Sequence, residues 1–301
     1  MRKLDLVIVG AQKAGTTSLN QYLKSHSGVV GHSVVEFTYF TDHRLYNTGF
    51  ESAFKKYFDK QEYKKIVAKN VTISQNEDSL IKLREHNQDV KIVFLLREPV
   101  SRAYSSFNMA IKDGWIDTDF NELQKIIIDK NYNHIKYRHF IKPGQYASSL
   151  KMILKYFPEN NIRIYLFEDL MKFPQLISND IFEWINLDKS IISTGIHNIT
   201  VKPRSRYISR LVNLMRSQNN FVNRTIRKIL PYNYYNKIGQ MIINLNRSKS
   251  RFDPMNSNMK GILENHYSSS NRELISLLNK DKLKDSFIMF STNNWISEIH
   301  N

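Results

Sequence analysis

A glycine-containing loop near the N-terminus has residue types that bind phosphate. The apolar segment Leu4–Val9 runs into GAQKAGTTSL, residues 10–19, so a strand is followed by a turn and the start of a helix. This arrangement aims backbone N–H groups at an anion. The residues expected to surround the anion are Lys13, Ala14, Gly15, Thr16, Thr17 and Ser18. The alternative is an ordinary strand-to-helix turn that needs glycine for its conformation.

The loop differs from that of nucleotide triphosphatases, G-x4-G-K-[ST]. Gly10 and Gly15 have the right spacing, but Thr16 stands where the lysine belongs. The lysine is Lys13 instead, two residues before the second glycine. We therefore expect an anion site without the usual arrangement for the β- and γ-phosphates and Mg²⁺ of ATP.

A second group of phosphate-binding residue types follows the apolar segment Lys91–Leu96. Arg97 comes at the end of this expected strand, and Ser105 lies eight residues further on, in an expected helix. A guanidinium presents a fork of donors to phosphate oxygens, and a serine adds a hydroxyl donor. The alternative for Arg97 is a surface ion pair with Glu98 or Asp113.

Together these two segments resemble the sulfotransferases that use 3'-phosphoadenosine-5'-phosphosulfate (PAPS), particularly the heparan-sulfate type and its bacterial relatives. VIVGAQKAGTTSL is similar to the loop that binds the 5'-phosphosulfate, and KIVFLLREPVSRAYSSF is similar to the strand, loop and helix that bind the 3'-phosphate. The resemblance continues through residues 144–170 and the RFDPMN segment to Trp295. It implies PAPS as donor, adenosine 3',5'-bisphosphate as product, and no required metal.

The resemblance also implies which residues act at the reacting centre. Glu36, in VVEFTYF, occupies the position of the general base in the family's K-E-x-x-F-F motif, although Val35 replaces the lysine. Lys69 matches the lysine of an E-K-x-P/S segment, whose suggested role is to contact the sulfuryl group or the acceptor, although Ala68 replaces its glutamate and the proline is absent. Lys13 is expected to stabilise charge as the S–O bond breaks. The alternatives are a solvated glutamate at position 36 and a solvated strand-end lysine at position 69.

Three further residues have less specific signals. Arg204 and Arg206, in VKPRSRY, resemble a basic loop that closes over the nucleotide's 3'-phosphate in bacterial sulfotransferases. Alternatively, they face the acceptor. His32 lies four residues before Glu36, and some sulfotransferases use a histidine base, but loop histidines are more often structural or solvated.

The positioning elements alternate between strand and helix patterns over the first 190 residues. Short apolar segments at Leu4–Val9, Lys91–Leu96 and Arg163–Phe167 predict buried parallel strands. The expected helices are 17–25, 79–85, 102–111, 146–157 and, after about residue 202, 208–215 and 256–278. We expect a P-loop-like three-layer α/β fold in which helices flank a central parallel sheet. The prediction is one domain, residues 1–301, with an α/β core at 1–190 and a mostly helical, basic part at 191–301.

Composition limits the function classes. The 301 residues contain no cysteine, which excludes disulfides, thiolate catalysis and cysteine metal sites. Neither a signal segment nor a run of some 18 apolar residues is present, so we expect a cytoplasmic protein.

The net charge is +16, and the interval between Asp188 and Asp253 has 13 basic residues and no acidic one. Polyanion binding, contact with an anionic membrane surface and a solvated basic face are all compatible with that interval.

The conclusion from sequence is a sulfotransferase acting in line on a hydroxyl or amine of a carbohydrate, glycolipid or small molecule. A P-loop kinase or hydrolase is the nearest alternative, but Arg97 stands where such an enzyme wants a metal-binding carboxylate. A polyanion- or membrane-binding protein is the other alternative. Residues 189–251 contain Phe221, Tyr232, Tyr234 and Tyr235, which could stack on bases or sit at a lipid interface. Because this alternative leaves both phosphate motifs unexplained, we treat glycan or membrane contact as accessory and do not expect nucleic acid.

Overall fold

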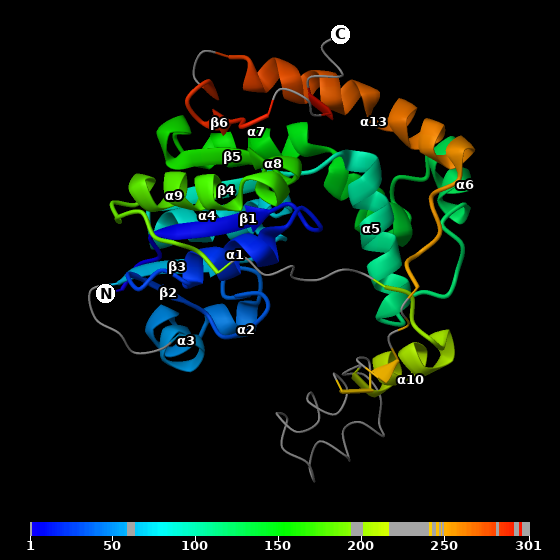
Figure 1. Cartoon of the computed structure of the whole chain (residues 1–301), viewed down its shortest axis with the longest axis horizontal. Coiled ribbons are helices and arrows are strands. Elements are labelled where there is room, and N and C mark those ends of the chain that lie inside the picture. Colours follow the sequence, from blue (N-terminus) through cyan, green and yellow to red (C-terminus); the bar gives the residue numbers. More distant parts are fainter. Residues whose placement is uncertain are drawn as a thin grey trace. The chain divides into compact units, whose positions relative to one another are not determined.

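The structure is a computed structural model of the whole chain (Figure 1). It describes residues 2–58, 64–193, 201–216, 241–242, 245–246, 248, 250–280, 283–291 and 295–296. Four of the aromatic residues in the basic interval, at positions 221, 232, 234 and 235, lie outside the described residues.

A six-stranded sheet, parallel at every pairing, forms the centre of the fold. Its strands are β1 Leu6–Gly10, β2 Val29–Gly31, β3 Lys65–Lys69, β4 Lys91–Leu96, β5 Ile162–Leu166 and β6 Phe287–Ile288, in the spatial order β2-β3-β1-β4-β5-β6. The three strands expected from sequence are β1, β4 and β5, each within two residues of its expected bounds. Strands β2, β3 and β6 were not predicted, because two are very short and β3 begins and ends with lysine.

Helices cover both faces of this sheet. The helices described are α1 Thr16–Lys24, α2 His43–Tyr46, α3 Phe50–Tyr57, α4 Glu77–His86, α5 Pro99–Lys112, α6 Glu122–Ile128, α7 Tyr146–Tyr156, α8 Phe167–Lys172, α9 Pro174–Trp184, α10 Arg206–Arg216 and α13 Ser257–Leu278. Helix α1 packs on α9, and α4 packs on α7. The connection through α1 and that through α4 run in opposite directions along the sheet, so right-handed crossovers place these helices on opposite faces. The expected three-layer α/β fold is confirmed.

Strand order decides which loops can form a site. Strand β1 pairs with β3 on one side and β4 on the other, with Ile8 opposite both Lys69 and Val93. The carboxyl ends of β1, β3 and β4 therefore meet at one edge of the sheet. Ligands bind at this edge in open α/β sheets. Residues 11–15, Lys69 and Arg97, all singled out from sequence, follow or end these three strands.

The chain divides into two compact units. The first comprises residues 1–102, 142–197 and 265–301 and contains the whole sheet. The second comprises residues 103–141 and 198–264, including most of α5 and all of α6 and α10. Aromatic packing organises its interior: the ring of Phe107 lies 5.0 Å from that of Phe120 and 5.2 Å from that of Phe140.

Candidate functional site

The loop between β1 and α1 is held in a conformation that few residues adopt. Lys13 has φ 70° and Gly15 has φ 80°, both in the left-handed region. At Gly15 a β-carbon would also lie 2.9 Å from the Phe167 ring, so glycine is required there for space as well as conformation. Ala14, between Lys13 and Gly15, is fully buried.

The loop ends at the N-terminus of α1, where backbone donors are available. Gly15 is the N-cap residue and provides no side-chain hydrogen bond, and the first helical bond runs from the Leu19 N–H to the Gly15 carbonyl at 3.1 Å. The N–H groups of residues 16–18 consequently have no acceptor within the helix. The helix dipole adds partial positive charge at the same place. This end of α1 has the geometry of an anion site.

Arg97, at the end of β4, contacts the same loop. Its Nη1 donates a hydrogen bond of 3.0 Å to the Lys13 carbonyl oxygen, and its guanidinium lies 4.5 Å from the Phe167 ring centre. Burial lowers the Arg97 pKa, and Glu168 opposes that shift. The two carboxylates considered as ion-pair partners have other contacts. Glu98 accepts the N–H groups of Val100 and Ser101, and Asp113 lies 3.4 Å from Lys112.

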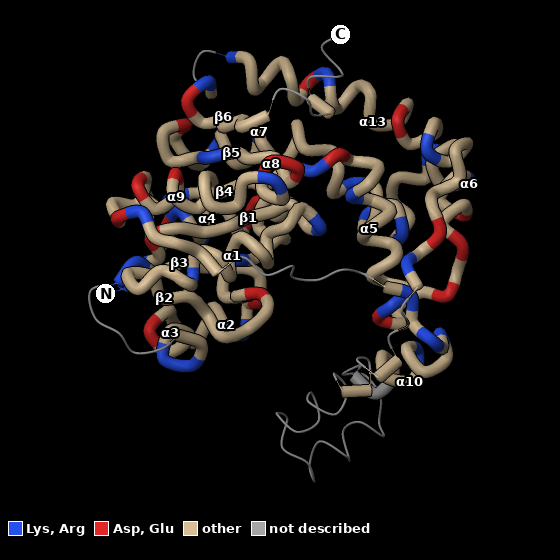
Figure 2. The backbone as a smooth tube through the Cα atoms, in the orientation of Figure 1, with Lys and Arg blue, Asp and Glu red and all other residues tan. Residues whose placement is uncertain are grey.

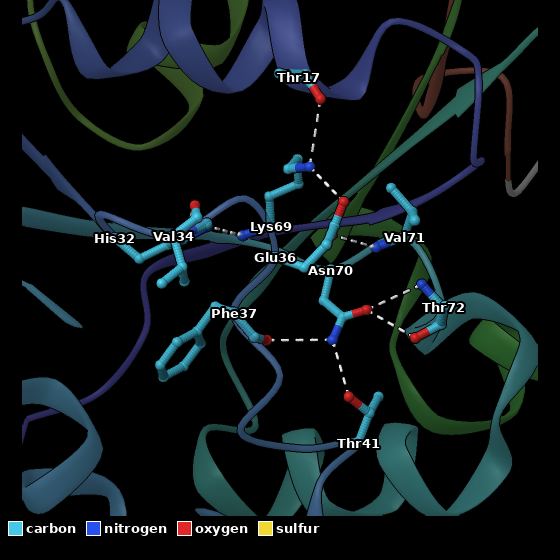
Figure 3. Close-up of polar contacts among 10 residues, drawn as sticks. All are labelled: Thr17, His32, Val34, Glu36, Phe37, Thr41, Lys69, Asn70, Val71 and Thr72. Atoms are coloured by element: carbon cyan, nitrogen blue, oxygen red, sulfur yellow. Dashed lines mark hydrogen bonds and ion pairs between the residues drawn. The ribbon is translucent and has the colours of Figure 1, made fainter. Parts of the chain in front are cut away.

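On the other side of β1, Lys69 ends strand β3 (Figure 3). Its side chain is only 1% exposed. Its Nζ lies 2.5 Å from Glu36 Oε1 and 3.4 Å from Thr17 Oγ1, in the first turn of α1. The alternative prediction of a solvated lysine at position 69 is wrong, because the side chain is buried. An ammonium this buried requires a charged partner, which Glu36 supplies. Residues 33 positions apart in sequence thus form one ion pair beside the phosphate-type loop.

Glu36 keeps access to solvent although it is bound on both oxygens. Its side chain is 30% exposed, and Oε2 accepts the Val71 N–H at 3.1 Å. Burial raises the Glu36 pKa above its ordinary value, while Lys69 and the Val71 N–H act in the opposite direction. A carboxylate that is fixed in position, partly exposed and raised in proton affinity has the properties of a general base.

His32 holds the loop that carries Glu36. Its Nε2 accepts the Lys69 N–H at 3.0 Å and its Nδ1 bonds the Val34 carbonyl at 2.8 Å, so the neutral Nδ1–H form is the one that satisfies both contacts. The Lys69 carbonyl accepts the Phe37 N–H at 2.8 Å. His32 and Phe37, before and after Glu36, are thus both hydrogen-bonded to the backbone of Lys69. With both ring nitrogens engaged, His32 is a structural residue and has no nitrogen left for proton transfer.

Burial lowers the pKa of His32 to about 4, well below its ordinary 6.5. We therefore expect its ring to remain a neutral Nδ1–H imidazole from pH 8 to pH 5. Nitrogen–proton NMR, with the His32 signals assigned by their absence in His32→Gln, measures this directly. A His32 ring that gains its proton near pH 6.5 would contradict the geometry.

Asn70 belongs to the candidate site, and the sequence analysis did not select it. Its Nδ2 donates to the Phe37 carbonyl at 3.2 Å and to Thr41 Oγ1 at 3.0 Å, while Oδ1 accepts the backbone and hydroxyl donors of Thr72 (Figure 3). The buried side chain thereby ties the loop after Glu36 to the segment after β3. Its position directly after a strand end was the available signal.

Comparison with known proteins identifies the family. The model of the sulfotransferase domain family matches residues 3–261. This chain belongs to the sulfotransferase domain family.

Individual relatives agree with this assignment. Membrane-associated sulfotransferase kil1 of Dictyostelium discoideum is 29% identical over 111 residues, 36% of this chain and 23% of kil1. The bifunctional heparan sulfate N-deacetylase/N-sulfotransferase 1 of Caenorhabditis briggsae is 26% identical over 223 residues, 69% of this chain and 25% of the relative. The chain thus spans about a quarter of the length of these two curated relatives.

A solved structure shows the same fold. The crystal structure of a sulfotransferase from Alicyclobacillus acidocaldarius superimposes with a TM-score of 0.56 at 18% identity, covering 72% of this chain and 92% of the other. The sheet and helices described above therefore have the P-loop-like fold of that structure.

The site residues expected from sequence fall into two sets. The first unit brings together the residues of the loop and helix start, Arg97 and the ion pair: Lys13, Ala14, Gly15, Thr16, Thr17, Ser18, Glu36, Lys69 and Arg97. Ser105, Arg204 and Arg206 belong to the second unit. There the Arg204 N–H donates to the Asn246 carbonyl at 2.6 Å, and Arg206 pairs with Asp117 at 3.4 Å.

Metal-binding groups and membrane-spanning helices are the two remaining features that bear on function. Among the described residues, no group of three or more histidine, aspartate and glutamate side chains has a metal-binding arrangement. None of the helices in the described part of the chain combines the length and apolar character that a bilayer crossing needs.

Proposed function

We propose that this chain transfers a sulfuryl group from PAPS to a hydroxyl or amine of a carbohydrate or glycolipid. The observation that carries the proposal is the Glu36–Lys69 ion pair, which meets the first turn of α1 at Thr17 beside the anion-type loop. A proton acceptor and an anion site lie at the same sheet edge, as sulfuryl transfer requires. The relative named for heparan sulfate favours a carbohydrate acceptor.

The residues present fit the donor. The N–H groups at the start of α1 and the hydroxyls of Thr16, Thr17 and Ser18 would hold its 5'-phosphate end, over a glycine that no side chain could replace. We assign Arg97 to the 3'-phosphate; it also fixes the loop through the Lys13 carbonyl. For Ser105, Arg204 and Arg206, contact with the 3'-phosphate stays a prediction from the family resemblance. When bound, the donor supplies an activated sulfuryl group whose bond to the phosphate breaks as the bond to the acceptor forms.

The chain's own groups would act on charge and protons. Glu36 takes the proton from the attacking hydroxyl or amine, since its raised pKa favours proton uptake. Lys13 neutralises the charge that develops on the departing phosphate. Lys69 acts as a positioning residue that holds Glu36 at 2.5 Å. The relative named as membrane-associated supports a peripheral location at a membrane.

Binding of the desulfated product tests the donor assignment. Calorimetric titration with adenosine 3',5'-bisphosphate, without metal, should show binding, and ATP should bind far more weakly. Arg97→Ala removes a charged donor and should weaken bisphosphate binding by about 10- to 100-fold. Arg84→Ala, an exposed arginine on α4, is the matched control and should bind normally.

Two results would contradict this assignment. One is equal or tighter binding of ATP, which would favour a kinase-type site. The other is unchanged bisphosphate affinity in a folded Arg97→Ala protein, which would remove Arg97 from the nucleotide site.

A further inference from the structure

Helix α10 packs against its own unit through one narrow face. Ser209 and Val212 are 1% and 2% exposed. A β-carbon on Gly114 would lie 2.2 Å from the Ser209 carbonyl oxygen, so the turn at Gly114 approaches the helix backbone closely. Asn213 donates to the Gly114 carbonyl at 3.2 Å. These contacts fix which way the helix faces.

A different face of α10 presents large apolar side chains to solvent. Tyr207 is 71% exposed, Leu211 is 44% exposed and Ile208 is 39% exposed. At 100° per residue these three fall within about 100° of one another, roughly opposite Ser209. A helix in contact with water alone would normally have polar residues here, so this stripe indicates an apolar partner.

A basic side chain borders the apolar stripe. Arg210 projects between Tyr207 and the packed face; its side chain is 64% exposed, and its Nη1 lies 3.9 Å from Asp117 Oδ2. Figure 2 shows the basic positions along α10. A long basic side chain at the edge of an apolar stripe reaches phosphate groups while the stripe inserts beside it.

The charge of the whole second unit extends this pattern. Residues 103–141 and 198–264 contain 18 lysines and arginines and 7 aspartates and glutamates. This net charge of +11 accounts for most of the chain's +16. An anionic partner is therefore favoured, and a second copy of this strongly basic unit is disfavoured.

An exposed tryptophan lies next to the helix. Trp115 is 59% exposed and stands between Gly114, which packs on Ser209, and Asp117, which pairs with Arg206 and Arg210. Tryptophan and tyrosine are the side chains most enriched where membrane meets water.

We propose that α10 docks on an anionic lipid surface, lying in the plane of the interface. Tyr207, Ile208 and Leu211 enter the acyl boundary, Arg210 contacts lipid phosphates, and Trp115 sits at the headgroup level. An anionic glycan would bind the basic residues, but its binding would not require the aliphatic stripe. The proposal goes beyond the transfer reaction and holds whichever acceptor is sulfated.

Co-sedimentation of the full chain with vesicles tests this proposal. Binding should be strong to vesicles of phosphatidylcholine with phosphatidylserine and at least about tenfold weaker to phosphatidylcholine alone. Tyr207→Ser combined with Leu211→Ser should weaken binding to the anionic vesicles by about tenfold or more. Arg210→Glu should weaken it by about tenfold and reduce its salt dependence.

Matched surface variants complete the experiment. Ile128→Ser removes an aliphatic side chain of comparable exposure, 60%, from α6 of the same unit. Lys130→Glu reverses a charge two residues after α6 ends. Both variants should bind vesicles normally. Equal binding of the α10 variants, or binding to heparin but to neither vesicle, would overturn the proposal. Self-association that is lost in the Tyr207/Leu211 variant would assign the stripe to a second copy instead.

Discussion

Lys13→Ala should lower the rate of sulfuryl transfer by about 10²- to 10³-fold without unfolding the protein. Alanine removes the ammonium and retains the backbone contact that Arg97 makes with the loop. Arg97 donates to the backbone carbonyl of Lys13, and the next residue, Ala14, is fully buried. The chemistry and the scaffold of this loop are therefore separable by mutation.

Lys13→Gly makes the separation sharper. Lys13 has φ 70°, a conformation that glycine adopts without the steric cost paid by other residues. The glycine variant should be as stable as the wild type, or up to about 1 kcal/mol more stable, and still lose turnover. Initial rates and thermal unfolding of both variants measure the two effects, and Lys172→Ala, an exposed lysine at the end of α8, is the control. A near-normal rate in either Lys13 variant would remove Lys13 from the reaction.

The fold could be predicted from sequence where its signals are local. The continuous apolar segments of β1 and β4 and the glycine turn at residue 15 correctly predicted these strands and the turn into α1. Strand β3 was missed because only three apolar residues lie between Lys65 and Lys69. Tertiary burial between β1 and β2 overrides that local pattern.

The candidate site was predictable only in part, for the same reason. Glu36 and Lys69 were selected through the family resemblance, and nothing in their spacing indicates that they touch. Their contact depends on the pairing of β3 with β1, which local sequence does not encode. Val35, in the position of the family's lysine, is 73% exposed, so the cation that contacts Glu36 comes from β3. The neutral, structural role of His32 likewise appears only when β3 supplies its partner.

Glu36→Gln should lower turnover by about 10²- to 10⁴-fold, since the amide keeps a hydrogen-bonding oxygen for Lys69 but cannot accept the acceptor's proton. A base must be deprotonated, so wild-type turnover should fall as the pH decreases through the Glu36 pKa. Burial places that pKa above the ordinary 4.5, and the acid limb should lie correspondingly higher. The residual rate of the glutamine variant should lack this limb. Glu85→Gln, an exposed glutamate on α4, is the control.

Lys69→Met tests the same assignment from the other side of the ion pair. Methionine fills similar space, but it removes the buried cation that holds the Glu36 pKa down against the larger effect of burial. The acid limb of turnover should therefore move to higher pH in this variant, in addition to any loss of rate from a less well fixed Glu36. A pH–rate profile of kcat measures the shift directly. If the limb stayed in place while the rate fell, the group that titrates would not be Glu36, and Lys69 would act on the sulfuryl group instead.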